Sequence, residues 1–181
     1  GVRYYGELAG KSHEMLVGAV LVGLFRPMLS SSITLVNARN VAEQRGLEII
    51  ESHSSRARNF TSLISVKLHT SKGERWAEGA IFEPGKPRLV LLDGVEIEAP
   101  LEESLLVIRN NDQPGVIGEV GTILGRHKIN IATFALGRET SGAIGLVNIE
   151  SSLGTDNKSP ETVLNEIRKI KAVQSASLVN L

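Results

Sequence analysis

Apolar residues follow two patterns in the first hundred residues. Residues 15–25, MLVGAVLVGLF, are apolar at nearly every position, which is typical of a helix buried on most of its sides. Ser12 is a candidate N-cap for this helix, which is predicted to run to Arg26. A second helix is predicted in ITLVNARNVAEQRG, residues 33–46, where Gly46 provides a C-terminal stop.

Extended segments follow these helices. Strands are predicted where apolar and β-branched residues are bounded by turn-forming residues, over residues 47–54, 60–70 and 74–83. Residues 88–100, RLVLLDGVEIEAP, are typical of a hairpin with Asp93 and Gly94 at its turn. The first hundred residues are therefore predicted to form an α+β domain, with its helices before its strands.

From Leu101 onward the predicted order is strand, helix, strand, strand, helix, strand. The first of these helices, residues 116–128, places its apolar side chains on one face: Val116, Ile117, Val120, Ile123 and Leu124. The second begins at Pro160, with Ser159 as its candidate N-cap. The four strands are predicted over residues 105–109, 129–139, 142–152 and 172–181.

This βαββαβ order is that of a ferredoxin-like fold, in which two helices cover one face of a four-stranded antiparallel sheet. The other face is expected to be open or to pair with a neighbour. Pro100 and the acidic residues after it mark the expected domain boundary. The predicted organisation is thus two domains, residues 1–100 and residues 101–181, in the α+β class.

Composition narrows the classes of function. The 181 residues carry 20 basic and 20 acidic side chains, so no basic footprint for nucleic acid and no polybasic membrane patch is expected. Cysteine is absent, which excludes disulfides, thiolate metal sites and a cysteine nucleophile. The longest apolar run is too short to span a bilayer. We expect a cytoplasmic protein with no metal site and no membrane partner.

The segment NNDQPG, residues 110–115, lies just before the predicted helix. The start of a helix has unpaired backbone N–H groups and a partial positive charge, so Val116 and Ile117 are predicted to bind a carboxylate. Asp112 is the candidate partner for an ammonium group. Asn110 and Asn130 offer both donors and acceptors. The segment is therefore predicted to bind a zwitterionic amino acid.

Simpler interpretations of these residues stay open. Asp112 before a Pro-Gly pair, and Asn130 at the start of a strand, are both typical turn formers. No catalytic residue is predicted, since the four histidines are scattered: His13, His53, His69 and His127. No G-x-G-x-x-G segment follows a predicted strand, so no NAD cofactor is expected in this stretch of chain.

Residues 105–181 resemble an ACT domain, the small-molecule sensor of many amino-acid metabolic enzymes, in LLVIRNNDQPGVIGEVGTILGRHKINI and in the strand GLVNIES. The preceding residues resemble the intervening, or allosteric substrate-binding, domain of long-form D-3-phosphoglycerate dehydrogenases. The segments that carry this resemblance are GELAG, LVGLFRPMLSSSITLVNARNVAEQRGLEIIES and WAEGAIF. Together the resemblance covers essentially the whole chain.

The resemblance implies a regulatory role in an NAD-dependent enzyme that performs the first step of L-serine biosynthesis. In that family L-serine binds between the ACT domains of two neighbouring subunits and inhibits the enzyme. The serine-binding positions correspond to Asn110, Asp112 and Asn130, beside the backbone of the helix start. The resemblance further implies self-association through ACT domains, and catalytic, NAD-binding domains elsewhere in the same chain.

Some relatives hold phosphorylated ligands near the last hairpin of the first domain. In this chain only Lys86 and Arg88 supply positive charge there, and Glu96 and Glu98 would repel a phosphate. The expectation is at most a weak anion site on Lys86 and Arg88.

Two other functions are compatible with this order of elements. Regulatory subunits of other amino-acid enzymes, such as an iron–sulfur L-serine dehydratase, carry similar domains. RNA-recognition domains share the βαββαβ order, but they expose aromatic rings on their strands for base stacking. The corresponding strands LLVIRN and GLVNIES have no aromatic residue, so a nucleic-acid partner is not expected.

Overall fold

The computed structural model of the chain describes all residues except 11–12, 30–31, 57–58 and 151–159. It separates into two compact units, Gly1–Glu78 and Gly79–Leu181. The candidate caps Ser12 and Ser159 lie outside the described residues. The predicted boundary at Pro100 stays a prediction, because the contacts alone place the hairpin before Pro100 with the second unit.

The first unit contains a strand, β1 (Val2–Gly6), that is not among the strands expected from the sequence pattern. The elements in chain order are β1 (Val2–Gly6), the 3-10 helix η1 (Glu7–Gly10), α1 (Glu14–Phe25), α2 (Ala38–Gln44), β2 (Glu51–Ser54), β3 (Ser62–Thr70) and β4 (Gly73–Glu83). β1 pairs in parallel with β2 and antiparallel with β3. Its signal was a short alternation, since Val2 and Tyr4 are buried and Arg3 between them is exposed.

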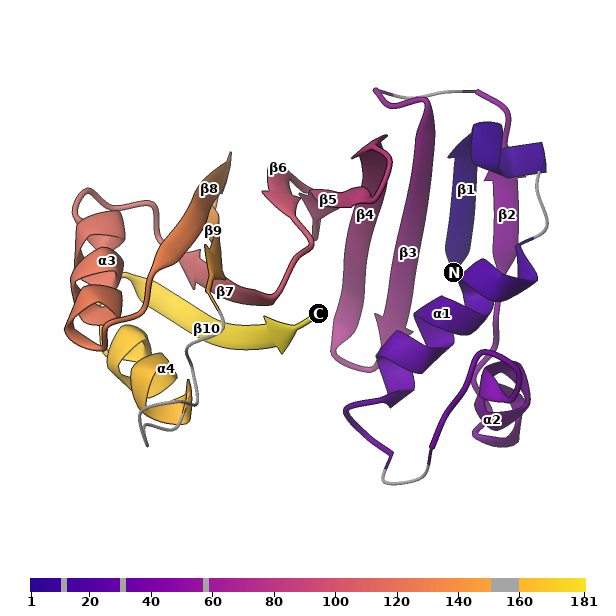
Figure 1. The fold of residues 1–181 in the computed structure, drawn as a ribbon, viewed down its shortest axis with the longest axis horizontal. Coiled ribbons are helices and arrows are strands. Elements are labelled where there is room, and N and C mark those ends of the chain that lie inside the picture. Colours follow the sequence, from indigo (N-terminus) through magenta and orange to yellow (C-terminus); the bar gives the residue numbers. More distant parts are fainter. Residues whose placement is uncertain (11–12, 30–31, 57–58, 151–159) are drawn as a thin grey trace. The chain divides into compact units, whose positions relative to one another are not determined.

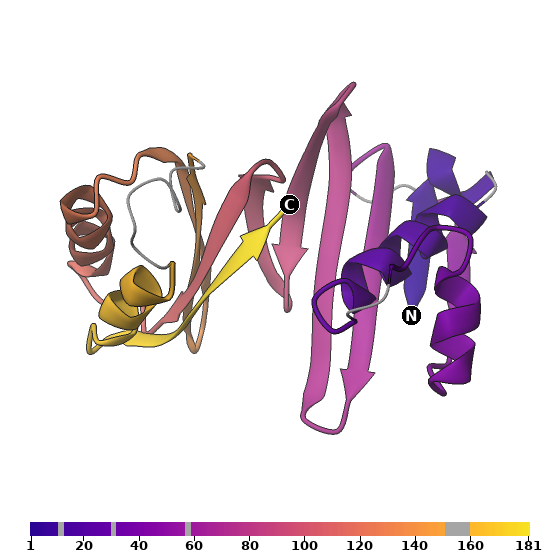
Figure 2. The same ribbon diagram turned by 60° about the horizontal axis from the view of Figure 1, so that its bottom comes forward.

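Both helices of the first unit cover the same face of β1 (Figure 1; Figure 2). Val17, Leu21 and Phe25 of α1 form a core with the buried side chains of β1 and α2. The expectation that α1 is buried on most sides is wrong within the described chain, because Met15 is 72% exposed and only one side of the helix is buried.

The second unit has the predicted order of elements. They are β5 (Lys86–Leu92), β6 (Val95–Pro100), β7 (Ser104–Asn110), α3 (Val116–Arg126), β8 (Ile131–Glu139), β9 (Gly142–Ile149), α4 (Pro160–Arg168) and β10 (Val173–Asn180). Asp93 and Gly94 connect β5 to β6 with positive φ angles of 49° and 89°, which confirms the predicted hairpin turn. Strand order β10-β7-β9-β8 confirms the ferredoxin-like fold.

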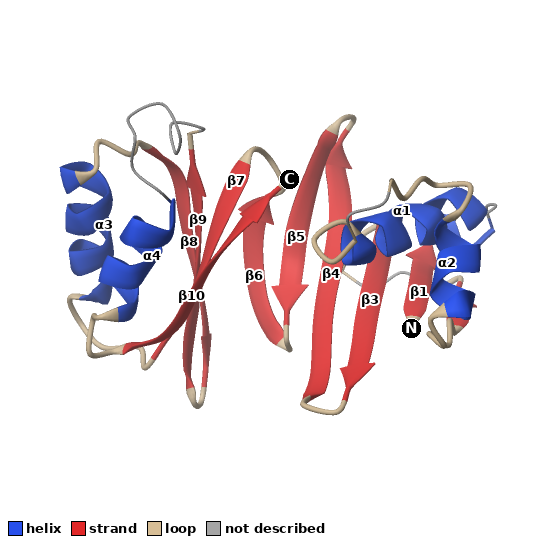
Figure 3. Ribbon diagram, turned by 90° about the horizontal axis from the view of Figure 1, so that it is seen from below, coloured by secondary structure: helices blue, strands red, loops and turns tan. Residues whose placement is uncertain are grey.

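Helices α3 and α4 lie on one face of this sheet (Figure 3). Their apolar faces form a single core with the inward-facing residues of β7 and β9, centred on side chains that are almost fully buried: Leu106, Ile108, Val120, Leu124, Val147 and Ile167. Four of the five positions predicted for the apolar face of α3 are buried. Ile117 is the exception, because it is 48% exposed.

The opposite face of the sheet is covered by β6, so the expectation that it is open or paired with a neighbour is wrong for this part of the face. A Cβ on Gly137 of β8 would lie 2.7 Å from Val95 Cγ1 and 2.8 Å from the Glu96 carbonyl oxygen. Only glycine permits that close approach. The buried Asn148 side chain also donates to the carbonyl oxygens of Pro100 and Glu102, at 3.1 and 3.2 Å.

Within the described residues, none of the helices combines the length and the apolar character that crossing a bilayer requires.

Candidate functional site

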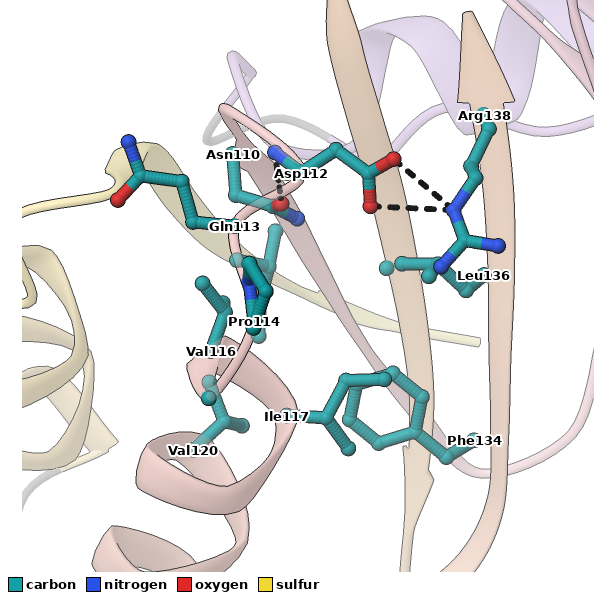
Figure 4. A pocket seen from close by; sticks show the side chains of 13 residues that line it. Asn110, Asp112, Gln113, Pro114, Val116, Ile117, Val120, Phe134, Leu136 and Arg138 are labelled. Carbon is teal, nitrogen blue, oxygen red and sulfur yellow. Dashed lines mark hydrogen bonds and ion pairs between the residues drawn. The ribbon is translucent and has the colours of Figure 1, made fainter.

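The loop after β7 owes its shape to one buried amide. Asn110 ends β7 and is only 4% exposed. Its Oδ1 accepts a hydrogen bond from the backbone N–H of Asp112 at 2.8 Å. Asp112 has a φ of 50°, a left-handed conformation that aspartate tolerates better than most residues. This turn directs the Asp112 carboxylate away from its own strand and toward β8 (Figure 4).

A cavity of about 310 Å³ lies between this loop, the start of α3 and strand β8 (Figure 4). Its lining combines polar and apolar residues. The polar ones include Asn110, Asp112, Gln113 and Arg138, and the apolar ones include Ile108, Ile117, Val120, Phe134, Leu136 and Gly145. A volume of this size and a mixed lining suit a small amphiphilic molecule.

The start of α3 forms one wall of the cavity. Gly115 is the N-cap residue, with a φ of 96° that glycine adopts without strain and no side-chain cap. Val116 N–H makes one long contact of 3.4 Å with the Gln113 carbonyl oxygen. The first intrahelical bond of α3 is donated by Glu119 to Gly115, so the helix start retains donor capacity on the cavity side.

The predicted partner of a ligand ammonium, Asp112, is already ion-paired within the chain. Arg138 Nε lies 2.9 Å from Asp112 Oδ2 and 3.1 Å from Oδ1. Sequence reasoning missed Arg138, although alternation along β8 places Phe134, Leu136 and Arg138 on one face of the strand. The pairing of loop and strand depends on tertiary structure, because 26 positions separate the two residues.

Asn130 lies away from this cavity in the same chain. It is exposed and precedes β8, and its carbonyl oxygen accepts the Glu150 N–H at 3.2 Å. Arg138 lies near the other end of β8, eight residues along, which is a distance of about 25 Å in an extended strand. One chain therefore brings together Asn110, Asp112, Val116 and Ile117, but not Asn130.

The two basic residues of the expected weak anion site are each paired with a carboxylate. Lys86 Nζ lies 2.6 Å from Glu83 Oε2, and Arg88 Nη1 lies 3.4 Å from Glu98 Oε1. These pairs reduce the positive charge that an anion would meet. An anion site there stays a prediction.

The first unit holds a separate polar cluster around Tyr4. The ring of Tyr4 stacks on His13 with 3.8 Å between centroids, and its hydroxyl donates to Glu51 Oε2 at 3.4 Å. Burial, together with the nearby carboxylate of Glu51, raises the pKa of Tyr4 to about 12. Arg39 neutralises Glu51 at 2.6 Å, so the cluster is internally balanced. Nowhere among the described residues do three or more His, Asp or Glu side chains gather closely enough to hold a metal ion.

The fold and the cavity define the class of the chain: an α+β unit is followed by a ferredoxin-like domain with a cavity of small-molecule size. Comparison with protein families agrees with this description. Residues 1–93 match the D-3-phosphoglycerate dehydrogenase intervening domain, and residues 104–172 match the ACT domain. The chain belongs to the family of D-3-phosphoglycerate dehydrogenase intervening domains, and its second domain is an ACT domain.

Curated relatives match nearly the whole chain. D-3-phosphoglycerate dehydrogenase of Archaeoglobus fulgidus is 35% identical over 178 residues, which are 97% of this chain and 33% of the relative. The enzyme of that name in Methanocaldococcus jannaschii is 33% identical, over 98% of this chain and 33% of the relative. The Bacillus subtilis enzyme of the same name is 29% identical, over 99% of this chain and 34% of the relative. The chain thus spans about a third of the length of these relatives.

Proposed function

We propose that this chain is the C-terminal regulatory portion of an NAD-dependent D-3-phosphoglycerate dehydrogenase, and that it binds L-serine as a feedback inhibitor. The observation that carries the proposal is the cavity at the start of α3, with Asp112 in its lining. The names of the relatives and the two matched domains support the identity of the parent enzyme. Catalysis and NAD binding belong to domains outside these 181 residues, in a cytoplasmic enzyme.

The cavity offers complementary groups for the two charges of an amino acid. Asp112 accepts hydrogen bonds from the ligand ammonium, and a charge-assisted bond of this kind is stronger than a neutral one. The start of α3, with Val116 and Ile117, favours the ligand carboxylate. Asn110 acts mainly by holding Asp112 in its turn.

In this proposal, Asn130 contributes to the serine site of a second copy of the chain, not to the site of its own chain. β8 is an edge strand of the four-stranded sheet, so it presents unpaired backbone groups along one side. Antiparallel pairing of two β8 strands about Phe134 would set Asn130 of one copy opposite Arg138 of the other. Such isologous pairing would complete two equivalent sites at once.

Serine bound between the two paired β8 strands would favour one arrangement of the two copies over another. A coupling free energy of about 1–3 kcal/mol is sufficient for useful inhibition. The first domain would pass the change to the catalytic domains.

Titration calorimetry with L-serine tests the proposal directly, with D-serine and glycine as comparison ligands. We expect L-serine to bind best, and the D112N variant to weaken binding roughly 10- to 100-fold. Asparagine is the sharper replacement because it keeps the size of Asp112 and its tolerance of positive φ. The proposal is wrong if wild-type chain gives no heat with millimolar L-serine, or if D112N binds it unchanged.

A further inference from the structure

Arg138 has no role in the site so far, although it is the residue that contacts the Asp112 carboxylate. We propose that Asp112 and Arg138 act together as the element that recognises a zwitterion: Arg138 binds the carboxylate of the effector while Asp112 binds its ammonium. This inference rests on the proposed function, because it assigns the recognition of an amino acid to a residue of the same cavity.

The geometry leaves Arg138 free to bind a second anion. Its Nε contacts both Asp112 oxygens, at 2.9 and 3.1 Å. Within the part of the chain that the structure describes, these are the polar contacts of the Arg138 side chain, so both terminal NH₂ groups keep their donors. The side chain is 69% exposed and lines the cavity with Asp112 and the start of α3 (Figure 4). A guanidinium has donors on two edges, which allows it to bind two carboxylates.

Both members of the pair are held in place by neighbouring parts of the fold. The Asn110 amide holds Asp112 in its left-handed turn at 2.8 Å. Arg138 is fixed in register by pairing of β8 with β9, where it lies opposite Ala143. Its neighbour Gly137 packs directly on β6, which prevents the end of β8 from shifting toward that side. The two charges are therefore arranged before a ligand arrives, which reduces the entropic cost of binding.

The order of charges matches an α-amino acid. A ligand ammonium beside Asp112 and a ligand carboxylate beside Arg138 would give four alternating charges in a closed ring. Asp112 alone would favour any amine, and the start of α3 carries only a partial positive charge. A full cation beside Asp112 adds a requirement for a carboxylate on the same ligand, and so excludes simple amines. Arg138 is thus inferred to determine the class of ligand.

The experiment compares three ligands that differ by one charged group each. L-serine has both groups, ethanolamine lacks the carboxylate, and 3-hydroxypropionate lacks the ammonium. Affinities are measured by calorimetry on the 181-residue chain for wild type, R138Q and R138K. The matched control is R126Q, because Arg126 also pairs with a carboxylate, Glu166 at 3.2 Å, but lies at the far end of α3.

We expect R138Q to weaken the affinity for L-serine roughly 10- to 100-fold. R138K should weaken this affinity less, and R126Q should leave it unchanged. Ethanolamine should bind R138Q at least as well as it binds wild type, because removal of the cation leaves Asp112 more available. The preference for L-serine over ethanolamine therefore collapses in R138Q.

Two results would overturn the inference. One is R138Q with unchanged or stronger L-serine binding, which would make Arg138 a bystander or an internal competitor for Asp112. The other is an equal loss of affinity for L-serine and for ethanolamine in R138Q, which would indicate a purely structural role of Arg138. Failure of the proposed function is a different outcome, because then wild type itself would not bind L-serine.

Discussion

At the scale of single residues, Asn110 shows how a buried polar side chain shapes a binding loop. Asn110 is almost fully buried at the end of β7, and its Oδ1 supplies an acceptor to the backbone N–H of Asp112 in the loop. Asn111 beside it is exposed. Adjacent asparagines with similar sequence signals therefore have different roles.

This difference predicts the effect of truncation. N110A should lower the free energy of unfolding by about 1–3 kcal/mol, because the Asp112 N–H loses its partner inside the structure. N111A should change it by no more than about 0.5 kcal/mol, as is usual at exposed positions. Urea denaturation of both variants measures this, and equal stabilities would show that the turn does not depend on the Asn110 amide.

Gly137 supports a second prediction at this scale, about the contact of β8 with β6. G137A should destabilise the chain by about 1–3 kcal/mol, because its Cβ would lie within 3 Å of three atoms of β6. The control is G121A in α3, where a Cβ meets nothing within 4 Å and better helix propensity should give up to about 1 kcal/mol of stability. Thermal unfolding of the two variants measures the expected loss and the expected gain of stability. A G137A variant as stable as wild type would contradict the close packing of β8 on β6.

At the scale of elements, the two helices of the ACT domain are joined at their ends by a polar contact. His127 follows α3 and its Nε2 lies 2.9 Å from Glu166 Oε1 of α4, with Arg126 also near Glu166. This hydrogen bond is the main factor that lowers the pKa of Glu166 below its ordinary value of 4.5. The contact supplements the apolar core between the helices and the sheet.

The direction of this pKa shift gives a prediction about pH. Because the Glu166 pKa is lower in the folded chain than in the unfolded chain, the interaction stabilises the fold above about pH 4.5 and is lost as the pH falls through the lowered pKa. E166Q should therefore lose stability at pH 6 and show a smaller further decline toward pH 3 than wild type. Denaturation midpoints across that range measure it, with E119Q at an exposed position of α3 as control. Parallel curves for wild type and E166Q would refute the coupling.

At the scale of the whole molecule, the proposed site joins loop residues of one copy to Asn130 of another. A ligand shared between two copies must strengthen their association by the same factor by which association strengthens ligand binding. This reciprocity makes self-association a measure of effector binding that is independent of catalytic activity.

Sedimentation velocity tests this linkage. Saturating L-serine should shift the chain toward dimers, with a decrease in the dimer dissociation constant of roughly 5- to 150-fold. The N130A variant should reduce the shift while leaving the fold of the single chain unaffected, because Asn130 is exposed. A chain that binds L-serine without any change in association would show that one copy holds the whole site.

Much of the fold was predictable because it depends on local patterns. Helix α3, strands β8 and β9, and the Asp93 and Gly94 turn each lie within one short segment, and the structure confirms all of these elements. β1 was missed because five residues carry little pattern. Ile117 belongs to the predicted apolar face of α3 but is 48% exposed, because periodicity indicates a face but not where the core ends.

By itself, then, the sequence determined the order of helices and strands after β1, the βαββαβ domain and the polar segment at the start of α3, because hydrophobic periodicity and turn chemistry act between near neighbours. Only the tertiary structure decided that Arg138 meets Asp112, that β6 covers the second face of the sheet at Gly137, and that Asn130 lies a strand length from Asn110. Those outcomes depend on strand register and on the packing of segments far apart in the chain, and no local pattern encodes either.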